Sequence, residues 1–117
     1  MSNLDRLVSI AFKQAVKSTH QYKHGAVIFR QGKVISKGYN ETHRGVSQYK
    51  GYWEGSCHAE IAALIRAKGT AAGASILIVR RHYRNSRPCN SCRAALQVAG
   101  IKNVFYTDDG NLVKEKI

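Results

Sequence analysis

The sequence is poor in proline, in acidic residues and in long hydrophobic runs. Of its 117 residues, one is a proline, Pro88, and three are cysteines. No hydrophobic run approaches the length that crosses a bilayer, and residues 1–6 lack the basic start and apolar stretch of a signal peptide. We therefore expect a cytosolic protein without membrane contact, whose few thiols stay reduced.

The composition is that of a globular protein. Charged residues make up 22% and hydrophobic residues 44% of the chain, and there is no repeat, linker or low-complexity segment. We expect residues 1–117 to form a single domain with its own core. Nineteen lysines and arginines against seven acidic residues give a net charge of +12, which favours an anionic partner such as phosphate or nucleic acid. The alternative is a solvated basic surface.

Hydrophobic periodicity predicts three helices and about five strands. The predicted helices are 3–18, 57–68 and 88–99, and the predicted strands are 26–29, 34–39, 74–79, 104–106 and 112–114. Gln31–Gly32 and Asp109–Gly110 are short enough links for two hairpins. Residues 40–56 are expected to be a polar loop, with Ser56 capping the second helix and Pro88 opening the third. This order predicts an α/β fold: a three-layer α/β/α sandwich with one mixed sheet and helices on both faces.

Two short segments carry potential metal ligands, residues 57–60 (Cys-His-Ala-Glu) and residues 88–92 (Pro-Cys-Asn-Ser-Cys). His58, Cys89 and Cys92 offer one imidazole and two thiolates, a donor set that suits Zn²⁺. A catalytic zinc keeps three protein ligands and one open position. Glu60 lies close enough to reach a water there without being a ligand. The pattern H-x-E, 27 residues, P-C-x-x-C is the signature of zinc-dependent nucleobase deaminases.

Both segments lie where a helix is predicted to begin. Helix N-termini favour negative charge and so favour thiolates, and positions i and i+3 share one helix face, so both sulfurs can point at one ion. Glu60 would take the proton of water, protonate the ring nitrogen and pass a proton to the departing ammonia. The alternative is a closed structural zinc site with Cys57 as the fourth ligand. Adjacent residues diverge on a helix, which disfavours Cys57 and His58 on one ion.

The sequence resembles the cytidine deaminase superfamily, from the hairpin before Asn40 to the strand at Val104. The segments that carry the resemblance are 25–27 (Gly-Ala-Val), 38–40 (Gly-Tyr-Asn), 58–60 (His-Ala-Glu) and 88–93 (Pro-Cys-Asn-Ser-Cys-Arg). The resemblance implies that Asn40 hydrogen-bonds a sugar hydroxyl and that the Ala59 backbone contacts the base. His-Ala-Glu is similar to the deoxycytidylate and polynucleotide deaminases, whereas residues 88–93 are similar to the free cytidine deaminases. We also expect a homo-oligomer.

Two basic segments are predicted to hold the substrate. Residues 80–87 contain four arginines and lead into the cysteines; guanidinium groups suit phosphate, so Arg84 and Arg87 are expected to bind one. Residues 43–53, including His43, mix basic and aromatic side chains, which suits unstacked bases and phosphate. The alternatives are a solvated surface for the first segment, and packing on the core or on a neighbouring subunit for the second.

Three functions fit these features. The leading hypothesis is a zinc-dependent hydrolase that converts cytosine to uracil in a nucleoside or nucleotide, with its phosphate on the basic loop. The second is a polynucleotide deaminase that acts on single-stranded DNA or RNA. The third is a non-catalytic, zinc-containing module that binds nucleic acid, and the presence of Glu60 counts against it.

Overall fold

A five-stranded mixed sheet forms the centre of the protein, in a computed structural model that describes residues 3–19, 22–42 and 56–117. The strand order is β2-β1-β5-β6-β7, with β5 and β6 parallel and the other neighbours antiparallel. The strands are β1 (His24–Arg30), β2 (Lys33–Tyr39), β5 (Ser75–Arg80), β6 (Asn103–Asp108) and β7 (Asn111–Lys116). The helices are α1 (Asn3–Lys17), α2 (Ala59–Ala67) and α3 (Asn90–Val98).

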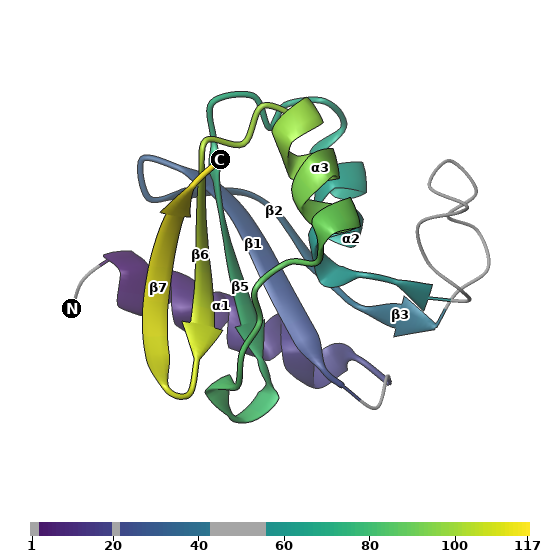
Figure 1. Cartoon of the computed structure of the whole chain (residues 1–117), viewed down its shortest axis with the longest axis vertical. Coiled ribbons are helices and arrows are strands. Elements are labelled where there is room, and N and C mark those ends of the chain that lie inside the picture. Colours follow the sequence, from purple (N-terminus) through teal and green to yellow (C-terminus); the bar gives the residue numbers. More distant parts are fainter. Residues whose placement is uncertain (1–2, 20–21, 43–55) are drawn as a thin grey trace.

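Helices cover both faces of the sheet, as predicted (Figure 1). Alternating residues of each strand point to opposite faces, so β1 supplies Val27 and Phe29 to the α1 side and Ala26 and Ile28 to the side of α2 and α3. The predicted three-layer sandwich is confirmed. None of the helices in the described ranges has the length and hydrophobicity to span a membrane.

Both predicted hairpin turns are present. Gln31 and Gly32 have φ angles of 52° and 77°, and Asp109 and Gly110 have 49° and 86°. Two successive residues with positive φ match the twist of antiparallel strands, and glycine adopts such angles without strain. The second turn makes β7 an edge strand beside β6.

The predicted starts of the second and third helices are wrong by two residues each. Ser56 does not cap α2; it lies in β4 (Ser56–Cys57), which pairs with β3 (Glu41–Thr42) in a separate two-stranded sheet. The prediction of a wholly irregular loop over 40–56 is therefore also wrong at both ends. Residues 43–55, with His43 and the basic and aromatic segment 43–53, lie outside the described residues, as does the side chain of Cys57.

Two glycines let helices lie directly on the strands. A Cβ atom on Gly25 of β1 would be 1.9 Å from the carbonyl oxygen of Ala11 in α1. A Cβ atom on Gly38 of β2 would be 2.5 Å from the backbone nitrogen of Ala63 in α2. Real Cβ atoms do not come so close, so only glycine allows these contacts. The contact at Gly38 fixes the first turns of α2 against the sheet.

Candidate metal centre

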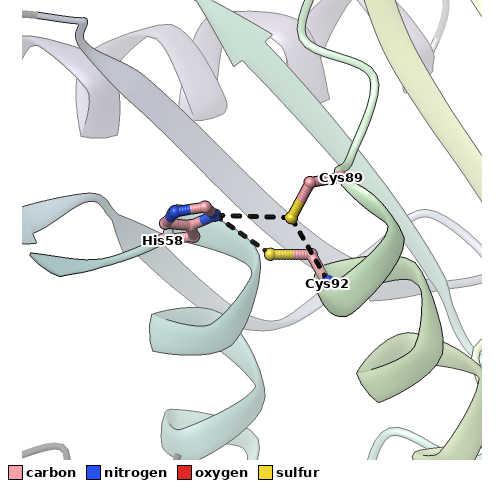
Figure 2. Close-up of side chains that lie close together, drawn as sticks. All are labelled: His58, Cys89 and Cys92. Carbon is pink, nitrogen blue, oxygen red and sulfur yellow. Dashed lines mark hydrogen bonds between the residues drawn. The ribbon is translucent and has the colours of Figure 1, made fainter. Parts of the chain in front are cut away.

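Three potential metal ligands meet where α2 and α3 begin (Figure 2). His58 precedes α2, Cys89 precedes α3, and Cys92 lies in the first turn of α3. One ring nitrogen and the two sulfurs all lie within 4.8 Å of one another. His58 Nδ1 is 3.1 Å from Cys92 Sγ and 3.9 Å from Cys89 Sγ. Tetrahedral zinc with bonds of about 2.0–2.3 Å places such atoms roughly 3.5–3.8 Å apart, so the three residues fit a zinc ion.

Local backbone geometry positions these side chains. His58 and Cys89 are the N-cap residues of α2 and α3, with extended backbones (φ −69°, ψ 154° and φ −66°, ψ 167°). An N-cap residue lies half outside the helix, which leaves its side chain beside the free N–H groups of the first turn. The backbone N–H of Cys92 donates to Cys89 Sγ at 3.4 Å. The helix end thus stabilises negative charge on this sulfur.

Glu60 lies in the first turn of α2 and is 5% exposed. Burial raises the pKa of its carboxyl group, while hydrogen bonds from its own backbone N–H and from Cys92 act in the opposite direction. A buried carboxyl group with a raised pKa is suited to accept and return a proton.

A pocket of about 240 Å³ opens onto the ligands. Its lining residues are Tyr22, His24, Asn40, His58, Ala59, Glu60, Ser86, Arg87 and Cys89. Cys92 is fully buried behind them and Cys89 is exposed, so a metal ion held here would be reached from the pocket side. The structure therefore brings together the predicted ligands, Glu60, and three of the four predicted substrate residues.

Arg84 is the predicted substrate residue that does not line this pocket. Its backbone carbonyl accepts a hydrogen bond from Thr107 Oγ1 at 2.7 Å, and its side chain is exposed. Arg87 does reach the pocket, and its Nε donates to Glu115 Oε2 at 3.2 Å. The two arginines of one basic segment thus lie in different surroundings.

Asn40 is 6% exposed and already makes hydrogen bonds within the chain. Its Oδ1 accepts from the backbone N–H of His24 at 2.9 Å, and its Nδ2 donates to the carbonyl of Tyr22. An amide has two N–H groups and two oxygen lone pairs, and these two bonds to described residues use one of each. These bonds fix the side chain at the pocket wall.

Sequence reasoning missed Ser86, which is 2% exposed and lines the pocket. Its hydroxyl donates to the carbonyl of Ile78 at 2.8 Å and accepts from the N–H of Thr107 at 2.8 Å. It therefore ties the segment before Cys89 to the ends of β5 and β6. Tyr22 and His24 were also missed. A serine in a polar loop, a tyrosine just before β1 and the first residue of that strand carry no motif that would have revealed them.

Comparisons with known proteins agree with this geometry. The family model described as the cytidine and deoxycytidylate deaminase zinc-binding region matches residues 1–108. The fold is similar to cytidine deaminase from Burkholderia pseudomallei, at 22% identity and a TM-score of 0.75, covering 99% of this chain and 93% of that one. It is also similar to dCMP deaminase from the cyanophage S-TIM5, at 21% identity and a TM-score of 0.62, covering 86% and 78%.

A third similar structure is the diaminohydroxyphosphoribosylaminopyrimidine deaminase/reductase from Thermotoga maritima, at 20% identity and a TM-score of 0.54, covering 86% of this chain and 27% of that one. No curated protein sequence matches this chain. Because the family model covers almost the whole length, the chain belongs to the cytidine and deoxycytidylate deaminase family, whose members are zinc-dependent hydrolases.

Proposed function

We propose that the protein hydrolyses the amino group of cytosine in a nucleoside or nucleotide, giving uracil and ammonia. The observation that carries this proposal is that His58, Cys89 and the buried carboxyl group of Glu60 line one pocket. The cyanophage neighbour was solved in complex with dCMP and dUMP, the substrate and product of such a reaction. That likeness supports the same substrate class here.

His58, Cys89 and Cys92 would hold the zinc ion. Zinc supplies the Lewis acidity that makes water a nucleophile at neutral pH. Glu60 accepts a proton from the attacking water and delivers it to the ring nitrogen of cytosine. It then moves the second proton to the amino group, which departs as ammonia. Water and cytosine thus become uracil and ammonia without a further reactant.

The remaining pocket residues would bind and orient the substrate. Ala59 is the first residue of α2, where helical N–H groups lack partners within the helix. We assign its backbone to the base. Asn40 would donate its second N–H group to a sugar hydroxyl, and Arg87 would bind a substrate phosphate from the pocket wall.

An ammonia-release assay on the zinc-loaded protein tests this function. The substrates are cytidine, deoxycytidine, their monophosphates and adenosine. We expect turnover of the cytosine compounds and none of adenosine. Zinc bound at one equivalent per chain, with no ammonia from any cytosine compound, would contradict the proposal.

Metal analysis of cysteine variants tests the ligand set. Cys89→Ala should lose zinc and stability, because the ion joins the starts of two helices. Cys57→Ala is the matched control and should keep one zinc per chain. A loss of zinc in Cys57→Ala alone would show that the ligand assignment is wrong.

A second candidate is deamination of single-stranded DNA or RNA. It is favoured by the charge of +12 and by the exposed side chains of Arg81 and Arg84 close to the pocket in sequence. A strand that contacts many cations loses affinity steeply as salt rises, whereas a mononucleotide does so weakly. Activity on a short oligonucleotide and on deoxycytidylate across a salt series would separate the two.

We further propose a homo-oligomer. Val98 on α3 is 90% exposed and Val16 on α1 is 62% exposed, and contact with neighbouring copies would remove this apolar surface from water. Light scattering after gel filtration measures the mass, and a monomer at micromolar concentration would contradict the proposal.

A further inference from the structure

Glu115 connects residues on both sides of the cysteine segment. It lies on the edge strand β7, beyond the residues 1–108 that the family model matches. Its Oε1 accepts from Arg93 at 2.8 Å, and Arg93 directly follows Cys92. Its Oε2 accepts from Arg87 Nε at 3.2 Å, and Arg87 lies two residues before Cys89. The carboxylate of Glu115 therefore binds one arginine before the two cysteines in the sequence and one arginine after them.

A third donor completes the arrangement. The hydroxyl of Tyr106 on β6 donates to Glu115 Oε2 at 2.7 Å. Together these donors hold the pKa of Glu115 at about 2, with the Tyr106 hydroxyl as the largest cause and the Arg87 hydrogen bond next. Arg93 also donates to the carbonyl of Lys116 at 3.3 Å. The first turn of α3 is thereby fastened to β7.

Arg87 binds Glu115 through its Nε atom. This hydrogen bond is the main cause of the raised pKa of Arg87, and Tyr106 makes a smaller hydrogen-bond contribution. Within the described ranges, the terminal amino groups form no ion pair with a carboxylate. Its side chain is 47% exposed and lines the pocket. A guanidinium group is a rigid planar fork, so holding Nε also fixes the direction of the terminal N–H groups.

We propose that Glu115 is a positioning residue that sets specificity for a phosphorylated substrate. It orients Arg87 for the phosphate at the pocket rim, and through Arg93 it holds the helix start that carries Cys92. This inference rests on the proposed function, since it assumes a cytosine nucleotide in the pocket. It adds a residue outside the motif region to the determinants of substrate choice.

Glu115→Gln tests the proposal, with Asp109→Asn as the matched control. Both variants remove one negative charge from the same hairpin, and asparagine tolerates the left-handed backbone at Asp109, whose side chain is exposed. Glu115→Gln should raise KM for deoxycytidylate about tenfold, the scale of a misplaced charge-assisted hydrogen bond. KM for deoxycytidine and both kcat values should stay within about twofold. Asp109→Asn should match the wild type.

A double-mutant cycle separates orientation from general damage to the fold. In an Arg87→Ala background, Glu115→Gln should change KM for deoxycytidylate by less than about twofold, because the group it orients is gone. Equal increases in KM for both substrates, or the same increase in both backgrounds, would overturn the specificity role. Glu115→Asp keeps the charge, but its side chain is shorter by one methylene group and cannot reach Arg87 in the same way. The same KM measurements are made on this variant if Glu115→Gln does not fold.

The rate of zinc release to a chelating dye tests the role toward the metal without turnover. Glu115→Gln and Arg93→Ala should release zinc several-fold faster than wild type, and Asp109→Asn at the wild-type rate. If the wild type deaminates no cytosine compound, the proposed function fails and zinc release alone decides. An unchanged release rate in Glu115→Gln would then overturn the positioning role.

Discussion

The two faces of the sheet bury apolar residues in different ways. On the α1 face a small cluster of Leu7, Ala11, Val27, Phe29, Leu77 and Val79 contains none of the potential ligands or pocket residues. On the other face a larger cluster extends from the sheet through α2 and α3 and includes Ala59 and Cys92, which belong to the site. The residues of the candidate metal site are therefore continuous with the larger core. We expect changes on the α1 face to alter stability alone, and changes on the other face to alter stability and chemistry together.

Glu60→Gln should have the largest effect on the reactive face. Glutamine has nearly the same shape but cannot carry the proton, so kcat should fall by about 10²–10⁴-fold. Zinc content and thermal unfolding should stay close to wild type, because Glu60 is not one of the three donors. Steady-state ammonia release and metal analysis on the same preparation measure both. Activity within tenfold of wild type would exclude Glu60 as the proton carrier.

Gly25→Ala and Gly38→Ala compare the faces directly. Each adds one methyl group against a helix backbone, at Ala11 and at Ala63 respectively, and each should cost about 2–4 kcal/mol of unfolding free energy. The effects on the site should differ. Gly38→Ala pushes the helix that begins beside His58, so its folded fraction should lose zinc affinity.

Gly25→Ala should keep normal zinc affinity and kcat per folded molecule. Urea unfolding and zinc titration at low temperature measure the two properties separately. Equal losses of zinc affinity in both variants would show that the two faces are mechanically coupled.

Much of this architecture follows from sequence periodicity and turn chemistry. The order of the three α-helices and of the five strands of the central sheet, and both hairpins, were predictable because each depends on neighbouring residues. The starts of α2 and α3 were not, because their N-caps are His58 and Cys89. These residues lie at the caps as potential metal ligands, whereas sequence rules look for serine, threonine, aspartate or asparagine.

The candidate site was predictable only where its residues are close in sequence. His58, Glu60, Cys89 and Cys92 follow from spacing within two short segments. His24 lines the pocket beside Asn40, because β1 pairs with β2 and the backbone N–H of His24 donates to Asn40 Oδ1. Such long-range pairing leaves no local pattern in the chain.

The difference between Arg84 and Arg87 was equally hidden. A short 3₁₀ turn at Arg81–Tyr83 redirects the chain after β5, with His82 and Tyr83 at φ angles of 64° and 53°. Non-glycine residues rarely adopt such angles, so this turn could not be predicted from the sequence. The turn decides which arginine reaches the pocket.

Ser86→Ala should have a smaller effect than the glycine variants. It leaves the Ile78 carbonyl and the Thr107 N–H without the buried hydroxyl, which should cost about 1–2 kcal/mol of unfolding free energy. Ser36→Ala is a matched control, because its buried hydroxyl donates to the carbonyl of Ala63 at 2.8 Å away from the pocket. Both variants should lose similar stability, but only Ser86→Ala should raise KM. A raised KM in both would contradict a local role for Ser86.

Low pH should weaken the ion pair between Glu115 on β7 and Arg93 on α3. The pKa of this carboxyl group is lowered to about 2 in the folded protein, against an ordinary value of 4.5. The ionised form therefore stabilises the fold above pH 4.5, and this contribution is lost as the pH falls from 4.5 toward 2. Because the ion pairs are partly exposed, we expect it to be about 1–2 kcal/mol.

Urea unfolding of wild type, Glu115→Gln and Asp109→Asn at pH 7, 5 and 3 measures this contribution. Glu115→Gln should be less stable than wild type at pH 7 and pH 5, with the difference shrinking at pH 3. An excess of chelator in every sample removes zinc from all three proteins, so that differences in zinc release do not enter the comparison. Asp109→Asn should follow the wild type at each pH, since Asp109 is an exposed turn residue. A difference between wild type and Glu115→Gln that stays constant from pH 7 to pH 3 would mean that the charge of Glu115 does not stabilise this edge of the sheet.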